Sequence, residues 1–168
     1  MENRGRIVAC DIYDHKLQRV MENAARLGIN IIDPMLKDAR EIHQDFSQQA
    51  DRVLVDAPCS GLGVLRRKPD SRWRKTQQLL KELPELQLEI LKSGAVCVKP
   101  GGILVYSTCT IAREENQAVV EKFLKDNAEF QLEHTGSRLP VPREDAMVQL
   151  YPQRDGTDGF FIACMRRK

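Results

Sequence analysis

The apolar positions of this chain fall into two kinds of stretch. Short runs rich in Val, Ile and Leu, with the length of buried strands, lie at 6–12, 29–36, 52–58, 103–109, 129–134 and 160–166. Apolar residues at helical spacing occupy 15–27, 84–98 and 113–127, and a further short helix is expected near 74–82. Strands that alternate with helices predict an α/β domain with a largely parallel sheet.

Glycine and proline residues set the expected ends of these elements. Gly28 follows the first helix as a C-terminal stop, and Pro84 suits the first turn of a later helix. Pro34 interrupts the second strand, and the KPGG sequence at 99–102 predicts a turn before the fourth. The length is enough for one domain with a sizeable hydrophobic core, so a single domain over 1–168 is expected.

Polar side chains follow four successive strands of the predicted sheet. Asp11 ends the first strand, and Asp38 lies just past the second. Asp56 and Cys59 follow the third strand, and Cys109 follows the fourth. A single Asp at such a place is most often a helix cap or a turn former. Because ligands bind beyond the carboxyl ends of parallel strands, the four together favour a functional site at one edge of the sheet.

The cysteines divide into two groups. There are five, an odd number at wide spacing and without a CxxC pair, so neither a disulfide framework nor a metal site is expected. Three lie in apolar runs and are predicted to be small core residues: Cys10, Cys97 and Cys164. Cys59 and Cys109 lie instead in polar turns after strands, where a thiol can be filler, half of a metal site or a nucleophile.

The overall composition is that of a globular protein, with 42% hydrophobic and 30% charged residues. No apolar run approaches the ~20 residues of a membrane span, and no apolar signal segment follows Met1. We therefore expect a cytoplasmic protein without a membrane partner. The three histidines are scattered without metal-ligand spacing, and surface or capping roles are expected for His15, His43 and His134.

Positive charge is concentrated in one segment, although the net charge is only +2. Residues 66–75 hold six basic side chains around Trp73. A solvated surface is the simplest interpretation, but basic residues beside an aromatic ring also suit phosphates and bases. The RNA-binding candidates are Arg66, Arg67, Lys68, Arg72 and Arg74. For Trp73, packing in the core is the favoured interpretation.

Three motifs resemble those of a known family. The sequences DAPCSGLGVLRRKPDSRW, VYSTCTIAREEN and DGTDGFF resemble the RNA cytosine-5 methyltransferases of the RsmB/Fmu/Sun type, within the NOL1/NOP2/Sun family. The resemblance runs from about residue 5 to the end of the chain. It implies the Rossmann-like fold of S-adenosylmethionine-dependent methyltransferases, with a mostly parallel sheet. The family's Gly-rich cofactor loop, its central first strand and its N-terminal RNA-binding region have no counterpart, so a truncated catalytic domain is expected.

The resemblance also implies roles for the residues at the strand ends. Cys109 matches the nucleophile, and Cys59 matches a second cysteine that helps to release the product. Asp11 matches the residue that holds the ribose hydroxyls of S-adenosylmethionine, and Asp38 matches a residue beside the adenine. Asp56 matches a residue between the cofactor and the target base.

The chemistry explains why two thiols are useful. C5 of cytosine is a poor nucleophile, and addition of a thiolate to C6 makes it electron-rich. The implied function is methylation of C5 of a cytosine in RNA, with 16S ribosomal RNA as the expected partner. Two alternatives remain: an incomplete piece that folds but binds cofactor weakly, and a cysteine hydrolase, which needs a histidine base near Cys109 or Cys59. Strands left without their central neighbour expose edges, so self-association or a rearranged sheet is expected.

Two remaining motifs receive structural interpretations. Glu114, Glu115 and Asn116 open a predicted helix, where acidic side chains favour the positive end of the helix dipole. DGTDGFF at 155–161 contains turn-forming Asp-Gly pairs before a strand. It predicts a tight turn near the site without a chemical role of its own.

Overall fold

The computed structural model describes residues 1–70, 77–139 and 142–168. Its N-terminal half contains β1 (Ile7–Asp11), α1 (Asp14–Arg26), β2 (Ile32–Leu36), η1 (Ala39–Glu41), α2 (His43–Phe46), β3 (Ala50–Asp56) and η2 (Leu62–Val64). Its C-terminal half contains α3 (Gln77–Cys97), β4 (Val98–Thr108), α4 (Gln117–Asp126), β5 (Phe130–Leu132), η4 (Thr135–Arg138), β6 (Met147–Leu150), α5 (Pro152–Asp155) and β7 (Phe160–Arg167). The predicted RNA contacts of Arg72 and Arg74, and the packing of Trp73, lie outside the described residues.

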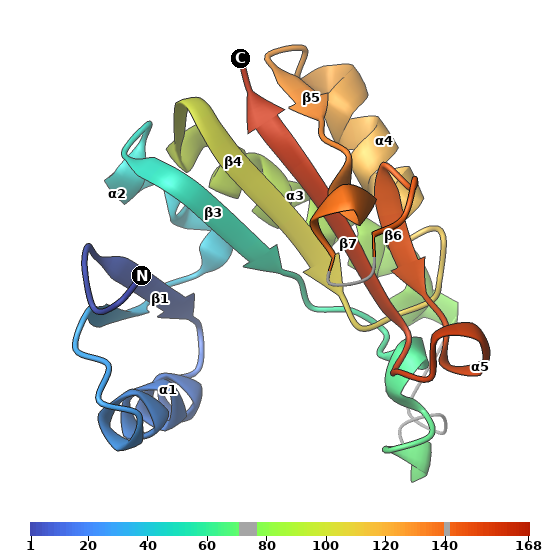
Figure 1. Ribbon diagram of the computed structural model, residues 1–168, viewed down its shortest axis with the longest axis horizontal. Helices are drawn as coiled ribbons and strands as arrows, with labels where there is room; N and C mark the ends of the chain where they lie inside the picture. Colours follow the sequence, from blue (N-terminus) through green and yellow to red (C-terminus); the bar gives the residue numbers. More distant parts are fainter. Residues whose placement is uncertain (71–76, 140–141) are drawn as a thin grey trace.

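The strands form two sheets (Figure 1). The smaller sheet pairs β1 with β2 in parallel. The larger has the order β3-β4-β7-β5, with β3 parallel to β4, and β6 pairs β7. The last strand, β7, runs antiparallel to β4, β5 and β6. The predicted α/β class is confirmed. The predicted site residues end or follow β1, β2, β3 and β4, and these strands pair in parallel, β1 with β2 and β3 with β4.

The two sheets are not joined to each other by strand pairing. Figure 1 shows the arrowheads of β1 and β3 pointing the same way, with a space between the two ribbons. Among the described strands, none pairs with both β1 and β3, so β3 forms an edge of the larger sheet. The structure therefore shows the exposed strand edges that the sequence analysis expects. Leu54 in the middle of β3 is accordingly 67% exposed.

The hydrophobic core lies between the larger sheet and the helices α3 and α4 behind it (Figure 1). Helix α3 approaches β3 closely because Gly94 has no side chain: a Cβ there would lie 3.1 Å from Val55 and 3.3 Å from Val53. Helix α4 is amphipathic and buries its apolar face, as its apolar spacing predicts. The fully buried apolar side chains include Leu91, Val98, Leu104, Tyr106, Val120, Phe123, Phe161 and Met165.

Several elements differ from their predicted bounds. The described part of α3 begins at Gln77, so Pro84 lies inside it instead of in its first turn. Leu83 and Leu88 are buried on either side of Pro84, which indicates that packing overrides the unfavourable proline. The KPGG sequence at 99–102 lies inside β4, where the pairing with β3 is irregular.

Two further differences concern short elements. Strand β6 was not predicted, because four residues are too few to show a hydrophobic period. Pro34 is accommodated within β2, which is an edge strand and tolerates a missing N–H donor. No helix in the described part of the chain is long and apolar enough to cross a membrane.

Candidate active site

The two predicted site cysteines meet because their strands are neighbours. Strands β3 and β4 pair in parallel up to Asp56, the last residue of β3, which lies opposite Ser107. The loops that follow stay together, since the Ala57 N–H donates to the Ser107 carbonyl at 3.0 Å and the Gly63 N–H donates to the Cys109 carbonyl at 3.0 Å. As a result, the Sγ atoms of Cys59 and Cys109 lie 3.3 Å apart.

Glycines make this close approach of loops possible. Gly61 has φ +68°, in the left-handed region that favours glycine. A Cβ at Gly63 would lie 2.8 Å from the Cys109 carbonyl oxygen and would overlap the backbone of Gly159. The Gly159 N–H donates to the Gly63 carbonyl at 2.9 Å. The 155–161 turn therefore lies against the cysteine loops, and its predicted position near the site is confirmed.

The two thiols share a proton unequally. A hydrogen bond from the Cys59 thiol lowers the pKa of Cys109 to about 7, although burial and the nearby Asp56 carboxylate oppose this. The same bond, together with burial, raises the pKa of Cys59 well above its ordinary value. Interacting groups of this kind titrate as a pair. Near neutral pH the pair therefore carries at most one negative charge, and that charge resides on Cys109.

Asp56 completes the cluster of predicted residues at this strand edge. It is the last residue of β3, and its carboxylate accepts a hydrogen bond from the Ser107 hydroxyl at 2.9 Å. Its charge is close enough to Cys109 to oppose ionisation of that thiol. The structure thus brings together three of the predicted residues: Asp56, Cys59 and Cys109.

A buried polar network below the thiols was not anticipated from the sequence. Glu115 is 1% exposed and lies before α4, turned toward the cysteine loops, so its prediction as a helix-opening acid facing the dipole was wrong. Its carboxylate accepts hydrogen bonds from the Ser60 N–H at 2.8 Å, from Gln87 at 3.0 Å and from the Thr110 hydroxyl at 3.3 Å. Glu114 beside it is exposed. The sequence signal for this network was the hydroxyl-bearing residue directly after each cysteine, Ser60 and Thr110.

Asn116 holds the β4 side of the cluster and was also not anticipated. Its amide nitrogen donates to the Thr110 carbonyl at 3.0 Å and to the side chain of Gln149 at 2.7 Å. Its amide oxygen accepts from the Thr108 hydroxyl at 2.5 Å. The residues on both sides of Cys109 are therefore bound to one buried amide, which fixes the loop that presents this thiol.

Asp11 is the last residue of β1, and Asp38 lies just past β2, so both adjoin the smaller sheet and not the thiols. One Asp11 oxygen accepts from the Tyr13 N–H at 2.9 Å, and the other lies 3.3 Å from the Lys16 ammonium. The Asp38 carboxylate caps η1 and binds the guanidinium of Arg40, which lowers the pKa of that carboxyl. No hydrogen bond or ion pair among the described residues joins either Asp to the thiol cluster.

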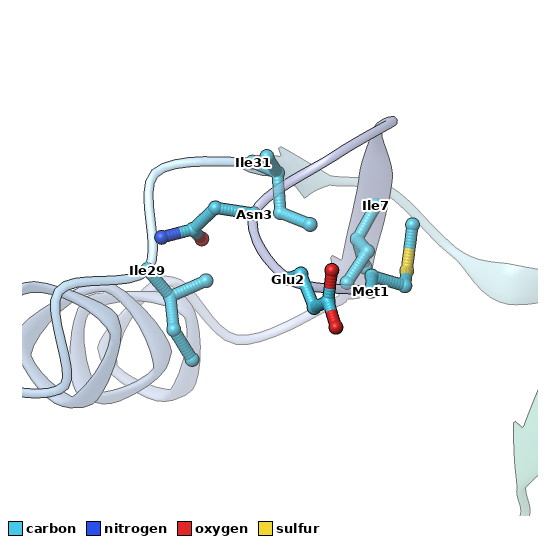
Figure 2. A pocket seen from close by; sticks show the side chains of 6 residues that line it. All are labelled: Met1, Glu2, Asn3, Ile7, Ile29 and Ile31. Carbon is cyan, nitrogen blue, oxygen red and sulfur yellow. The ribbon is translucent and has the colours of Figure 1, made fainter.

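The Asp11 carboxylate has more capacity left to accept hydrogen bonds from a ribose than the Asp38 carboxylate has for an adenine. The Asp11 side chain is 27% exposed, and its Lys16 contact is long enough for that oxygen to accept hydroxyl groups as well. Both Asp38 oxygens are already bound by Arg40. A hollow of about 380 Å³ beside the smaller sheet is lined by Met1, Glu2, Asn3, Ile7, Ile29 and Ile31 (Figure 2). It contains none of the predicted site residues.

The described part of the basic segment lies beside the 155–161 turn. Arg66 and Arg67 both contact Asp158, at 3.2 and 3.0 Å, and their side chains remain 50% and 68% exposed. Two guanidinium groups on one carboxylate leave excess positive charge. Lys68 is near enough to Cys109 to favour its ionised form. The three basic residues therefore adjoin the thiol cluster.

A histidine base is absent from the cluster as far as residues 1–70, 77–139 and 142–168 show. His43 contacts the Arg40 carbonyl and the Ser93 hydroxyl, at 3.1 and 3.0 Å. No contact of a histidine ring with Cys59 or Cys109 occurs in this part of the chain. The hydrolase alternative has no support from the geometry.

Solved structures that resemble this chain define its class. The chain superposes on the crystal structure of PH0851 with a TM-score of 0.91 and 37% identity, over 99% of this chain and 38% of that one. It is also similar to NSun6 from Pyrococcus horikoshii, solved with the S-adenosylmethionine analogue SFG, with a TM-score of 0.85, 32% identity and coverage of 99% and 42%. The fold is that of S-adenosylmethionine-dependent methyltransferases.

The sequence narrows the class to one family. The chain belongs to the 16S rRNA methyltransferase RsmB/F family, whose model matches residues 1–166. It is 44% identical, over its whole length, to the probable ribosomal RNA small subunit methyltransferase B of Bacillus subtilis (strain 168). The match spans 39% of that relative's length. The predicted family is confirmed.

Proposed function

We propose that this chain carries the catalytic thiols of an RNA cytosine-5 methyltransferase that acts on 16S ribosomal RNA. The observation that supports this most strongly is the pair of thiols 3.3 Å apart, with the pKa of Cys109 lowered to about 7. A thiolate is the reactive form of cysteine, and this pair supplies one near neutral pH. The family membership supports ribosomal RNA as the substrate.

In the proposed reaction, the Cys109 thiolate adds to C6 of the target cytosine. The new C–S bond converts the C5–C6 double bond into an electron-rich enamine, so that C5 can accept a methyl group. Asp56 would lie at the N3 and amino edge of the base, where a shared proton offsets the charge that develops on the ring. S-adenosylmethionine, when bound, supplies the electrophilic methyl group.

Product release requires a base, and Cys59 is suited to that role only after Cys109 has reacted. The Cys59 pKa is raised chiefly by its hydrogen bond to Cys109, so bonding of Cys109 to carbon removes that cause. Cys59 can then lose its proton to solvent, and its thiolate can accept the C5 proton. The electron pair of the C5–H bond re-forms the C5–C6 double bond, the C6–S bond breaks, and Cys109 leaves as a thiolate.

The substrate must reach the thiols as an unstacked base. A cytosine inside a helix would have to be flipped out, at a cost of a few kcal/mol. Arg66 and Arg67, half or more exposed beside the cluster, would hold phosphates of the flanking RNA. Arg72 and Arg74 are proposed for the same role on the resemblance alone.

The cofactor would lie beyond the carboxyl ends of β1, β2 and β3. Asp11 would accept the ribose hydroxyls, and Asp56 would lie where the methyl group meets the base. Asp38 would reach the adenine only if Arg40 gave up part of its contact with the Asp38 carboxylate. The open edge of β3 favours the view that the chain alone binds cofactor weakly. Calorimetric titration with S-adenosylmethionine, with Asp11→Ala as the comparison, measures this.

Covalent trapping tests the assignment of the two thiols. Cytidine-containing and 5-fluorocytidine-containing 16S RNA would be incubated with the natural full-length protein and S-adenosylmethionine, and adducts would be resolved on denaturing gels. We expect Cys59→Ala to accumulate adducts on ordinary RNA and Cys109→Ala to form none on either RNA. Cys10→Ala, on the smaller sheet, is the matched control. Adducts of Cys109→Ala with 5-fluorocytidine RNA would falsify the assignment.

A further inference from the structure

The Glu115 carboxylate lies between the two cysteine loops and binds both. Its Oε2 accepts from the N–H of Ser60, the residue after Cys59, at 2.8 Å. Its Oε1 accepts from the hydroxyl of Thr110, the residue after Cys109, at 3.3 Å. The hydroxyl groups of Ser60 and Thr110 are 2.8 Å apart and complete a closed ring of hydrogen bonds. One carboxylate therefore connects the two segments that present the thiols.

A second contact ties the other side of Cys59 to the same carboxylate. The Gln87 amide nitrogen donates to the carbonyl of Pro58 at 2.9 Å and to Glu115 Oε2 at 3.0 Å. The Gln87 amide oxygen is buried and has no hydrogen-bond partner among the described residues, which is energetically unfavourable. Residues on both sides of Cys59 are thus held from α3 and from the segment before α4.

The backbone of Glu115 is itself anchored to the sheet. The hydroxyl of Tyr106, a fully buried residue of β4, donates to the Glu115 carbonyl at 2.6 Å. Burial raises the pKa of this phenol, and the neighbouring Glu115 and Cys59 reinforce the rise. The phenol therefore stays a donor at all working pH values. The carboxylate is consequently fixed relative to both strand ends, and it is not free to follow either loop alone.

We propose that Glu115 is a positioning residue of the two-thiol site, which holds the Cys59 loop against the Cys109 loop so that the thiols stay within hydrogen-bond reach. The reaction that this serves rests on the proposed function. The positioning itself is a property of the free protein. Glu115 makes no described contact with either sulfur, so it acts through Ser60 and Thr110 and is not a catalytic residue in its own right.

The groups around Cys109 determine what disruption of this network would do. Cys109 faces Cys59, the Asp56 carboxylate and the Lys68 ammonium. The bond from Cys59 is the largest influence that lowers the Cys109 pKa, while burial and Asp56 raise it. Separation of the loops would weaken the Cys59 bond and leave the opposing influences in place. The Cys109 pKa should then rise toward or beyond that of an ordinary thiol.

The test is a titration of Cys109 reactivity in the absence of RNA and cofactor. The rate of Cys109 alkylation by iodoacetamide would be followed by peptide mass spectrometry as a function of pH. We expect a midpoint near 7 for the native protein, a midpoint at least one pH unit higher for Glu115→Ala, and an unchanged midpoint for the exposed neighbour Glu114→Ala. Glu115→Gln keeps an acceptor for Ser60, so it should restore most of the native midpoint. A folded Glu115→Ala protein with the native midpoint would overturn the proposal.

A second variant keeps the test decisive if Glu115→Ala does not fold. Thr110→Val preserves the shape of a fully buried side chain and removes the hydroxyl that links Glu115 and Ser60 to the Cys109 loop. The same upward shift is expected, and an unshifted midpoint in folded Thr110→Val would contradict the proposal. Because no methyl transfer is measured, failure of this inference and failure of the proposed function give different results.

Discussion

Replacement of Cys59 by alanine should make Cys109 a much weaker nucleophile at neutral pH. The hydrogen bond from Cys59 is the largest cause of the lowered Cys109 pKa, and without it burial and Asp56 leave the pKa at or above its ordinary value of 9.0. A group with a pKa of about 7 is about half ionised at pH 7, whereas one with a pKa of about 9 is ionised to about 1%. The thiolate fraction at pH 7 should therefore fall about 50-fold.

The Cys109 thiolate is the reactive form, so its formation determines how the reactivity of Cys109 changes with pH. Below pH 7 the native Cys109 is neutral and unreactive, and its reactivity rises as the pH passes through about 7. In Cys59→Ala the same rise should occur near pH 9 or above. The assay is the initial rate of iodoacetamide labelling of Cys109 between about pH 5.5 and 10, a range that covers both the native midpoint and the midpoint expected for Cys59→Ala.

Comparison of Cys59→Ala with the native protein also separates two effects of Cys59 in RNA trapping, its activation of Cys109 and its role in product release. Cys59→Ala should form its RNA adduct slowly at pH 7, faster at pH 9, and then retain it. Cys10→Ala is the control, because Cys10 lies on the smaller sheet and bonds the Lys37 carbonyl. A Cys59→Ala midpoint that stays near 7 would refute the idea that the thiols share a proton.

Three other predictions follow from the site and the fold. Gly63→Ala should lower the free energy of unfolding by roughly 1–3 kcal/mol, because its Cβ overlaps the backbone of Gly159, and a native-like denaturation curve would count against this packing. Joint replacement of Arg66 and Arg67 by alanine should weaken RNA binding and reduce its salt slope by about 0.7 for each phosphate that is no longer neutralised, whereas an unchanged slope would remove both from the interface. The open edge of β3 should drive self-association that Leu54→Asp reduces, and a native chain that sediments as a clean monomer would contradict this.

The thiol cluster was predictable because its residues follow from strand order. Asp56 ends β3, and Cys59 and Cys109 lie in the turns that follow β3 and the parallel β4, which the pairing of Asp56 with Ser107 places side by side. No detail of packing is needed for that inference. The same reasoning grouped Asp11 and Asp38 with them, but that step assumes one continuous sheet. The structure has two sheets, which the strand periods alone do not indicate, although the family resemblance, with no counterpart for the central strand, does.

The buried support of the site was not predictable from local patterns. Glu114, Glu115 and Asn116 have the sequence pattern of residues that open a helix, but α4 begins at Gln117, and of the three only Glu114 is exposed. Only the three-dimensional approach of Ser60, Thr110 and Gln87 gives Glu115 its partners, across 55, 5 and 28 residues of chain respectively. Contacts of that separation depend on the fold and leave no period in the sequence.

The most direct test of the central claim is nucleoside analysis of the product. 16S RNA that lacks modification would be incubated with S-adenosylmethionine and the natural full-length protein, digested, and examined by mass spectrometry. The account predicts 5-methylcytidine with the native protein and none with Cys109→Ala. Methylation at an atom other than cytosine C5, or 5-methylcytidine formed at the native rate by Cys109→Ala, would contradict it.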